Sequence, residues 1–211
     1  MSLIDAVNNF VPLAGEPSPF EQPPSGTRWK TVLRFPETLT EAELADRVLA
    51  RLDPWFHIAR EVPGQHWTGS TLRLDAILRP RDPRGWKNPN AALGVEFKRL
   101  LSTDVRNDSM GHTAGHAAQC IDYTQTEWAG YGRIPVFTCP GVMRWTERID
   151  DEHDFGAAMY TRLLGQFGVG ELILYWGFGL VFSLNGNPIW GERKGLIHGK
   201  TWGLTPRTGS R

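Results

Sequence analysis

The sequence predicts an α/β fold in which a helix, three strands, a second helix and a fourth strand build a mixed sheet flanked by helices. A C-terminal helix and hairpin are expected as additions to this core. Two observations predict the class. A capped amphipathic helix precedes three consecutive strand-like runs, and successive strands favour antiparallel pairing. A helical segment then separates the third run from a fourth, which permits a parallel crossover.

Composition limits the range of functions. The chain has 211 residues and 40% hydrophobic residues, enough for one domain with a core of normal size. Lys plus Arg equals Asp plus Glu at 23 each, so a nucleic acid or membrane partner would need a local patch of charge. The two cysteines, Cys120 and Cys139, indicate no disulfide framework and favour a reducing compartment. Without an apolar run of about 18 residues or a leader-like start, the sequence predicts a cytoplasmic protein with no membrane partner.

Proline and glycine content suggests three segments. Five prolines between residues 11 and 27 predict that residues 1–27 form an extended N-terminal arm. Residues 28–193 are expected to form a single domain. Residues 194–211 are Gly-rich and basic, and we interpret them as a tail.

The first half of the chain supplies most of the predicted core. Residues 28–35 alternate well enough for a strand. Thr40 and Glu43 match a capping box ahead of an apolar stripe, which predicts a helix over 40–52. Three further strands are expected over 55–62, 71–79 and 91–100, with a turn-rich loop between the last two.

The second half continues with a predicted helix over 113–128, with one face formed by Ala117, Ile121, Thr124 and Trp128. Residues 134–139 indicate a buried strand, and residues 155–167 a further helix. Two apolar runs within 171–190 flank Asn185 and Gly186, a pair typical of a hairpin turn.

Charged residues occupy one face of two neighbouring predicted strands. Leu93, Val95 and Phe97 alternate with Glu96 and Lys98. Asp75 lies on the preceding strand, and it would lie beside Glu96 if the two strands pair. Carboxylates at this range repel each other, and a divalent cation that prefers oxygen ligands, typically Mg²⁺, relieves the repulsion. Such a cation polarises a phosphate oxygen and lowers the pKa of bound water, while a lysine orients that water, so the set suits phosphodiester hydrolysis.

The same residues resemble a known pattern. Asp75 is followed after 21 residues by Glu96-Phe97-Lys98, and the predicted helix beyond carries Gln119 and Tyr123. This order is similar to the PD-(D/E)XK nuclease superfamily, and the Gln-X-X-X-Tyr spacing is similar to its RecB-like branch. The resemblance covers about residues 40–140 and implies a restriction-endonuclease-like core. The residue before Asp75 is leucine, where the family pattern has proline.

The resemblance implies a metal-dependent deoxyribonuclease that acts in recombination, repair, phage replication or defence. Mg²⁺, for which Mn²⁺ could substitute, would be held by Asp75, Glu96 and the backbone carbonyl of Phe97. Lys98 would position the water. The implied catalytic residues are therefore Asp75, Glu96, Lys98, Gln119 and Tyr123.

Three other acids are candidates for auxiliary metal ligands. Glu61 is kept as a candidate because it ends a predicted strand on the side of His57. Glu43 already serves the capping box, and Glu41 falls on the solvated face of the same helix, so both are interpreted as structural.

Local charge supports a nucleic acid partner, DNA in single- or double-stranded form. Residues 71–106 carry eight Lys or Arg against four Asp or Glu, a net charge of +4. Trp86 in the loop could stack on a base, although packing on the core is favoured for it. The candidate nucleic acid contacts are Arg73, Arg79, Arg99, His116, Gln119 and Tyr123.

Alternative functions stay open at this point. The same fold could cleave RNA, or it could be a DNA-binding or assembly module in which the acids form a structural ion-pair cluster. A zinc protein that uses His112 and His116, four residues apart, is a weaker alternative because no further ligands are evident. The oligomeric state does not follow from the sequence.

Overall fold

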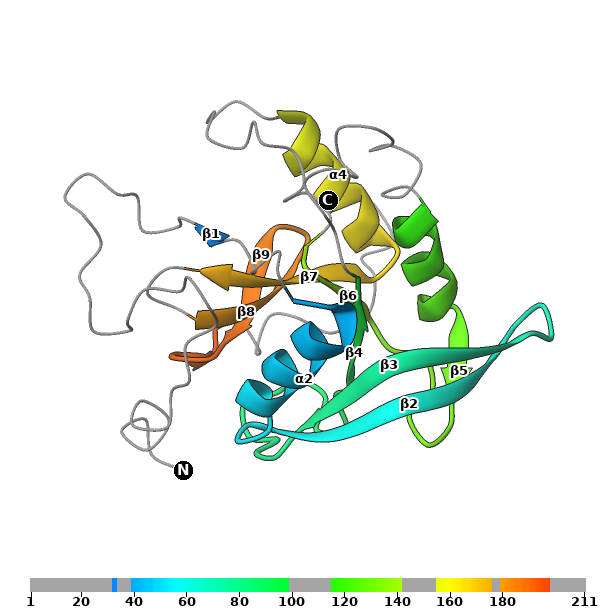
Figure 1. Cartoon of the computed structure of the whole chain (residues 1–211), viewed down its shortest axis with the longest axis horizontal. Coiled ribbons are helices and arrows are strands. Elements are labelled where there is room, and N and C mark those ends of the chain that lie inside the picture. Colours follow the sequence, from blue (N-terminus) through cyan, green and yellow to red (C-terminus); the bar gives the residue numbers. More distant parts are fainter. Residues whose placement is uncertain (1–31, 34–38, 99–114, 142–154, 176–178, 198–211) are drawn as a thin grey trace.

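The structure is a computed structural model, and it describes residues 32–33, 39–98, 115–141, 155–175 and 179–197. Its main feature is one large sheet (Figure 1). Nine strands follow the order β10-β9-β8-β7-β6-β4-β3-β2-β5, and β1 pairs with β7 off this path. The sheet is mixed and curls into a half-barrel.

The helix α2 (Glu41–Leu52) confirms the prediction for this segment. Thr40 is its N-cap, and the reciprocal capping box with Glu43 is present. Because apolar residues recur at helical spacing, one face of α2 is buried against the sheet. The buried apolar residues are Leu44, Val48, Leu49 and Leu52.

The strands β2 (Phe56–His66) and β3 (Thr71–Pro80) form a long antiparallel ribbon. The ribbon carries β5 (Thr126–Trp128) along the outer edge of β2 near its tip. The prediction ended the first of these strands at residue 62, before Pro63 and Gly64. Pairing with β5 keeps the chain extended through both residues to His66.

The strand β4 (Leu93–Phe97) pairs antiparallel with β3 and parallel with β6 (Val136–Cys139). The connection between β4 and β6 contains a helix over residues 115–124. This helix was predicted to run to residue 128, but its last residues instead form β5, because they find backbone partners on β2.

The C-terminal third adds one helix and four strands. The helix α4 (Phe155–Gln166) packs on β7 (Val169–Tyr175) and β8 (Gly179–Leu184). The strand β8 turns through Asn185 and Gly186 into β9 (Asn187–Gly191), which confirms the predicted hairpin. The short strands β10 (Gly195–Leu196) and β1 (Val32–Leu33) complete the sheet.

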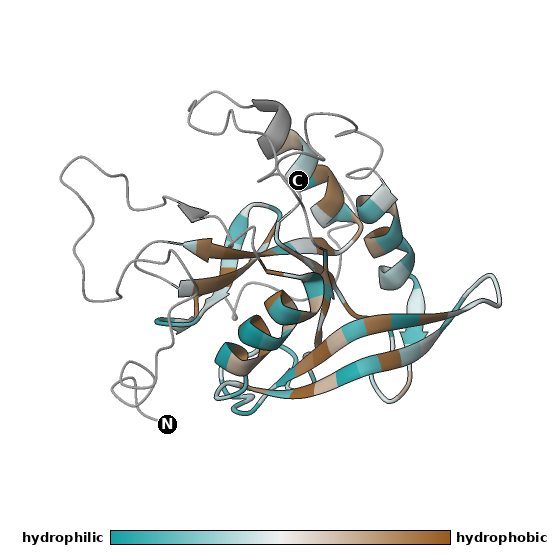
Figure 2. Ribbon diagram, viewed as in Figure 1, coloured by the Kyte–Doolittle hydropathy of each residue, from teal (hydrophilic) through white to brown (hydrophobic). Residues whose placement is uncertain are grey.

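Each face of the sheet has its own apolar core. The larger cluster lies under α2 and includes Phe56, Phe97, Phe182 and Trp190. The smaller cluster joins β3 and β6 to the helix over 115–124 through residues such as Ile77, Cys120 and Tyr123. Trp86 packs against the larger cluster. Figure 2 shows the hydrophobic colour concentrated along β7 and β8, where nearly every residue is buried.

The predicted fold class is wrong. A compact core of helix, three strands, helix and strand, flanked by helices as in restriction endonucleases, does not describe this sheet-dominated half-barrel with few helices. The predicted C-terminal additions are instead integral, because β7 pairs directly with β6 and continues the sheet. The runs Val169–Tyr175 and Gly179–Leu184 are buried almost throughout, so they need neighbours on both faces and both edges.

The predicted division into segments stays a prediction. The arm over residues 1–27, most of the tail and the loop before residue 115 lie outside the described residues. The first residues of the predicted tail include β10, which pairs with β9. Among the described residues, no helix is long and apolar enough to cross a membrane.

Candidate functional site

The strand register places Asp75 beside Glu96. β3 and β4 pair through Ala76 and Val95, so Asp75 and Glu96 form the next cross-strand pair. The Phe97 backbone N–H donates a hydrogen bond of 2.8 Å to Asp75 Oδ2, which fixes the carboxyl against β4. Cross-strand neighbours project from the same face of a sheet, so the two carboxyl groups share one surface.

The same register extends across six strands. Glu96 pairs with Thr138, Thr138 with Glu171, and Glu171 with Ser183. On the other side, Glu61 falls opposite Asp75, between the pairs of β2 with β3 that flank it. A line of polar side chains therefore crosses the sheet. We call it the polar row: Glu61, Asp75, Glu96, Thr138, Glu171 and Ser183.

Glu96 is the most constrained acid of this row. Only 6% of the residue is exposed. Burial, followed by the charge of Asp75, raises the pKa of Glu96 to about 9. The Gln119 side-chain amide donates to Glu96 Oε1 at 2.9 Å, whereas Glu96 Oε2 is buried with no hydrogen-bond partner among the described residues. A buried carboxylate oxygen without a donor is suited to a cation.

Asp75 shares this environment. Burial raises its pKa, the Phe97 N–H opposes that shift, and the charges of Glu41 and Glu61 raise the pKa further. The surroundings of Asp75 and Glu96 therefore disfavour the ionised form of each carboxyl group unless a cation binds nearby.

Glu41, which the sequence pattern led us to interpret as structural, lies beside the candidate site. It begins α2, and its Oε2 lies 3.8 Å from Lys98 Nζ. Its charge also raises the pKa of Asp75 and Glu96. The helical pattern assigned Glu41 to solvent, and the side chain is indeed 45% exposed. The packing of α2 against β4, which the pattern does not encode, brings its first turn to this edge of the site.

Lys98 follows directly after β4. Its backbone N–H donates to the Cys139 carbonyl at 2.9 Å, so the residue stays aligned with the strand although its side chain is half exposed. Lys98 Nζ lies 3.8 Å from Glu41 Oε2 at the start of α2, and the Lys98 charge adds to burial in lowering the pKa of His116.

Glu61 has an unusual backbone. Its φ angle is +52°, in the left-handed region that non-glycine residues rarely adopt. The side chain forms an ion pair of 2.7 Å with Arg73, and 57% of it is exposed. Strained residues of this kind cluster at functional sites. Its position fits the auxiliary role considered for it, at the exposed end of the polar row.

The helix over 115–124 buries its predicted face, including Ala117 and Thr124, and further residues beside it. Gln119 Nε2 donates to both Glu96 and the Tyr123 hydroxyl, the latter at 2.6 Å. Tyr123 is 6% exposed, and burial raises its pKa to about 12. His116 is 3% exposed, and burial lowers its pKa to about 4. His116 and Tyr123, two of the candidate nucleic acid contacts, are therefore buried.

The predicted basic contacts have protein partners. Arg73 pairs with Glu61, and Arg79 donates to the Gly130 carbonyl at 2.6 Å while lying 4.5 Å from the Tyr131 ring centroid. Arg99 lies outside the described residues.

The zinc alternative gains no support. Within the ranges that the structure describes, no three His, Cys, Asp or Glu residues are grouped to hold a metal ion, and His112 falls outside those ranges. Mg²⁺ has a smaller demand, because it usually keeps several waters and takes one or two carboxylates together with substrate phosphate. Asp75 and Glu96 are two neighbouring carboxyl groups of this kind.

Comparison of this chain with family models, with curated proteins and with solved structures finds no match. The assignment of function therefore rests on the geometry of the polar row and the residues around it.

Proposed function

We propose that this chain is a Mg²⁺-dependent nuclease that hydrolyses DNA phosphodiester bonds. The observation that carries the proposal is the buried Glu96 carboxyl, with Oε2 unpartnered, in register beside Asp75. Two carboxyl groups whose ionisation is disfavoured form a site that gains most when a divalent cation binds. The resemblance of Asp75, Glu96-X-Lys98 and Gln119-X-X-X-Tyr123 to PD-(D/E)XK nucleases supports DNA as the substrate.

Each residue has a defined task in this proposal. Asp75, Glu96 and the backbone carbonyl of Phe97 would hold the cation, which when bound polarises the phosphate and acidifies a water molecule. Lys98 would orient the attacking water and offset the charge that develops on the phosphate. Gln119 keeps the Glu96 carboxyl in place through its 2.9 Å hydrogen bond.

The reaction balances as a hydrolysis. The water oxygen forms a bond to phosphorus, the bond from phosphorus to one sugar oxygen breaks, and the products are a phosphate monoester and a hydroxyl group. The proton of the water passes to solvent or to the leaving oxygen. Glu41, 3.8 Å from Lys98, would tune the position of the ammonium.

Three substitutions separate the roles. Asp75→Asn and Glu96→Gln remove ligand charge, so both should lose Mn²⁺ binding and cleavage together. Lys98→Met keeps both carboxyl groups, so it should bind Mn²⁺ while cleavage falls on the order of 10²-fold. Asp82→Asn is the matched control, because Asp82 is an exposed acid that forms an ion pair of 2.6 Å with Arg84, two residues away.

The measurements are calorimetric Mn²⁺ titration and single-turnover cleavage of labelled single- and double-stranded DNA and RNA with Mg²⁺, Mn²⁺ or EDTA. Cleavage that persists in EDTA, or Asp75→Asn that binds Mn²⁺ as the unmodified chain does, would contradict the proposal. If the chain cleaves RNA in preference to DNA, the alternative of an RNA-cleaving nuclease replaces the proposal. Metal binding without any cleavage would favour the non-catalytic module.

A further inference from the structure

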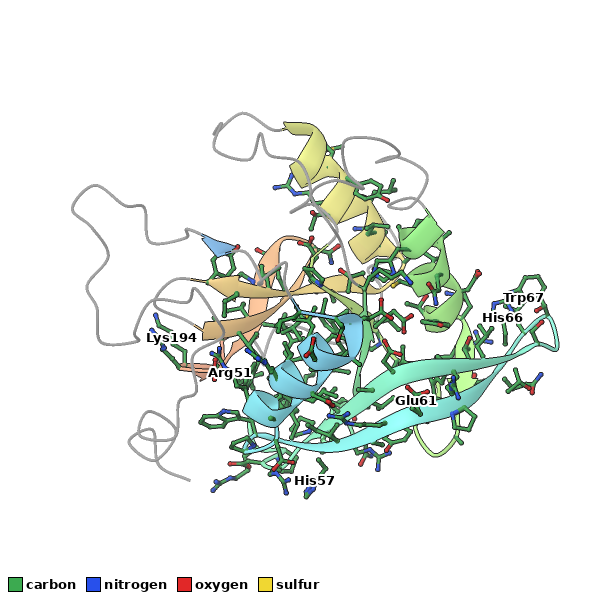
Figure 3. The ribbon with its side chains drawn as sticks, viewed as in Figure 1. Arg51, His57, Glu61, His66, Trp67 and Lys194 are labelled. Carbon is green, nitrogen blue, oxygen red and sulfur yellow. The ribbon has the colours of Figure 1, made fainter. Side chains whose placement is uncertain are left out.

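The β2–β3 ribbon ends in an exposed tryptophan. Trp67 begins the turn between the two strands, and 72% of it is exposed, the largest value for any large hydrophobic residue in the described part of the chain. Figure 3 shows Trp67 at the far end of the ribbon, away from the main body of the sheet. The Trp67 ring lies 5.6 Å from the His66 ring, centroid to centroid, at a tilt of 49°, and most of the indole remains in water.

The turn that carries Trp67 is held by several hydrogen bonds. The Gly69 N–H donates to the His66 carbonyl at 2.9 Å, and the His66 N–H donates to the Ser70 carbonyl at 2.8 Å. Gln65 Nε2 donates to the Gly69 carbonyl at 2.6 Å, and His66 Nδ1 contacts Thr68 Oγ1 at 2.7 Å. The tryptophan is therefore presented by an ordered turn, which lowers the entropy lost when a ligand packs on it.

The ribbon tip is also fastened to the helix of the candidate site. β5 pairs with β2 from Gly64 to His66, and Trp128 of β5 donates through Nε1 to the Tyr123 carbonyl at 3.1 Å. Gly64 permits this packing, because a Cβ there would lie 2.5 Å from the Trp128 ring. The tip therefore has a fixed position relative to Tyr123 and Gln119.

The residues around Trp67 add no negative charge of their own. Residues 63–73 contain no carboxylate that would repel the phosphates of a nucleic acid, and the arginine among them, Arg73, is paired with Glu61. Glu127, opposite Gln65 on β5, is engaged with Arg133 at 3.0 Å. The distance also fits. Asp75 lies four residues after Thr71, so the tip is about 14 Å from the candidate site along β3, or roughly four nucleotide steps at the spacing of one strand of a duplex.

We propose that Trp67 is a stacking platform for an unpaired base of the DNA substrate, placed a few nucleotides from the scissile phosphate. This inference rests on the proposed nuclease function and specifies its substrate as single-stranded DNA or a splayed end. A base must be unpaired and unstacked to lie on the indole face, and stacking tolerates any base because every base has a π-face. A base inside a duplex presents no free ring face, because it is stacked on its neighbours on both sides.

The test compares binding of two probes in EDTA, where no cleavage occurs. One probe is a fluorescein-labelled oligothymidylate of about 15 nucleotides, and the other is an abasic deoxyribose-phosphate oligomer of the same length. The unmodified chain should bind the base-bearing probe on the order of tenfold more tightly. Trp67→Ala and Trp67→Leu should abolish this difference, and Trp67→Phe should retain most of it. Leu163→Ala, which removes another exposed apolar side chain, on α4, is the control.

Two results would overturn the inference: equal binding of both probes by the unmodified chain, or a preserved difference in Trp67→Leu, which keeps apolar area but has no ring. The assay needs no Mg²⁺, so it separates the two proposals. A chain that shows the base-dependent difference but never cleaves DNA loses the nuclease function alone. A chain that cleaves but shows no difference loses the role of Trp67 alone.

Discussion

The Glu96 carboxyl is neutral in the folded, metal-free protein at pH 7, because its pKa is about 9 against an ordinary value of 4.5. The folded state therefore binds a proton that the unfolded state has released, and stability falls as pH rises from about 4.5 to about 9. We expect Glu96→Gln to be more stable than the unmodified chain in EDTA at pH 7, by on the order of 3 kcal/mol. Chemical denaturation at several pH values measures this.

The pH dependence provides the decisive comparison. Glu96→Gln should flatten the loss of stability between pH 5 and 9, whereas Glu43→Gln, at the exposed capping acid of α2, should leave the slope unchanged. Mg²⁺ should stabilise the unmodified chain most at high pH, because the ionised carboxylate is the form that binds the cation. If stability depends on pH with the same slope in both variants, Glu96 is not the source of the pH dependence.

Gln119 is the residue through which the helix over 115–124 acts on Glu96. Gln119→Ala leaves Glu96 Oε1 without its donor, so we expect the pKa of Glu96 to rise further and metal affinity to fall. The pH profile of cleavage should shift to higher pH without unfolding of the chain. Gln125→Ala removes an amide that donates to Thr124 Oγ1 at 3.2 Å, and it should leave the profile in place.

The β2–β3 ribbon and the strand β5 that pairs with it allow a prediction about a single structural element. A Cβ at Gly64 would lie 2.5 Å from Trp128 and 2.6 Å from Thr126, so Gly64→Ala should separate β5 from β2. We expect a loss of about 1–3 kcal/mol in stability, with faster hydrogen exchange over β5 and the ribbon tip. A Cβ added at Gly115 would have no atom within 4 Å, so Gly115→Ala should leave the stability of the fold unchanged or raise it.

Local patterns predicted the elements that depend on near neighbours. The capping box of Thr40 and Glu43 fixed the start of α2, and Asn185 with Gly186 fixed the β8–β9 turn. The alternation on β3 and β4 also placed Asp75 and Glu96 on one surface. Local patterns did not predict strands whose pairing partner lies far away in the sequence. Thr126–Trp128 continue a helical pattern, and only β2, some sixty residues earlier in the chain, makes them a strand.

The whole sheet could not be predicted for the same reason. The apolar runs of β7 and β8 indicated strands, but no local signal shows that β7 joins β6 in parallel. The approach of Glu41 to Lys98 depends on how α2 packs, and the continuation of the polar row to Glu171 depends on the order of β4, β6 and β7. Long-range packing of the complete chain decides these features.

A buried ion pair connects distant parts of the molecule. Arg51, near the end of α2, bonds through Nε to Glu192 Oε1 at 3.0 Å, and the Leu180 N–H donates to Glu192 Oε2 at 3.0 Å. We expect Arg51→Met to cost about 3–5 kcal/mol in urea denaturation, because it leaves a buried carboxylate without its cation. Arg60→Met, at an exposed pair with Asp46, should cost under about 1 kcal/mol. The double variant of Arg51 and Glu192 should lose less than the sum of the single losses.

The pairing of β1 with β7 joins residue 33 to residue 174. A chain emerging from the ribosome therefore carries β1 without its neighbour until nearly the whole sheet has been synthesised. The parallel steps from β4 to β6 and from β6 to β7 impose the same delay on the centre of the sheet. Until β7 arrives, β6 presents an open apolar edge, which is the form most exposed to aggregation or chaperone capture. Expression yield should therefore depend on the growth temperature more than the stability of the finished fold would indicate.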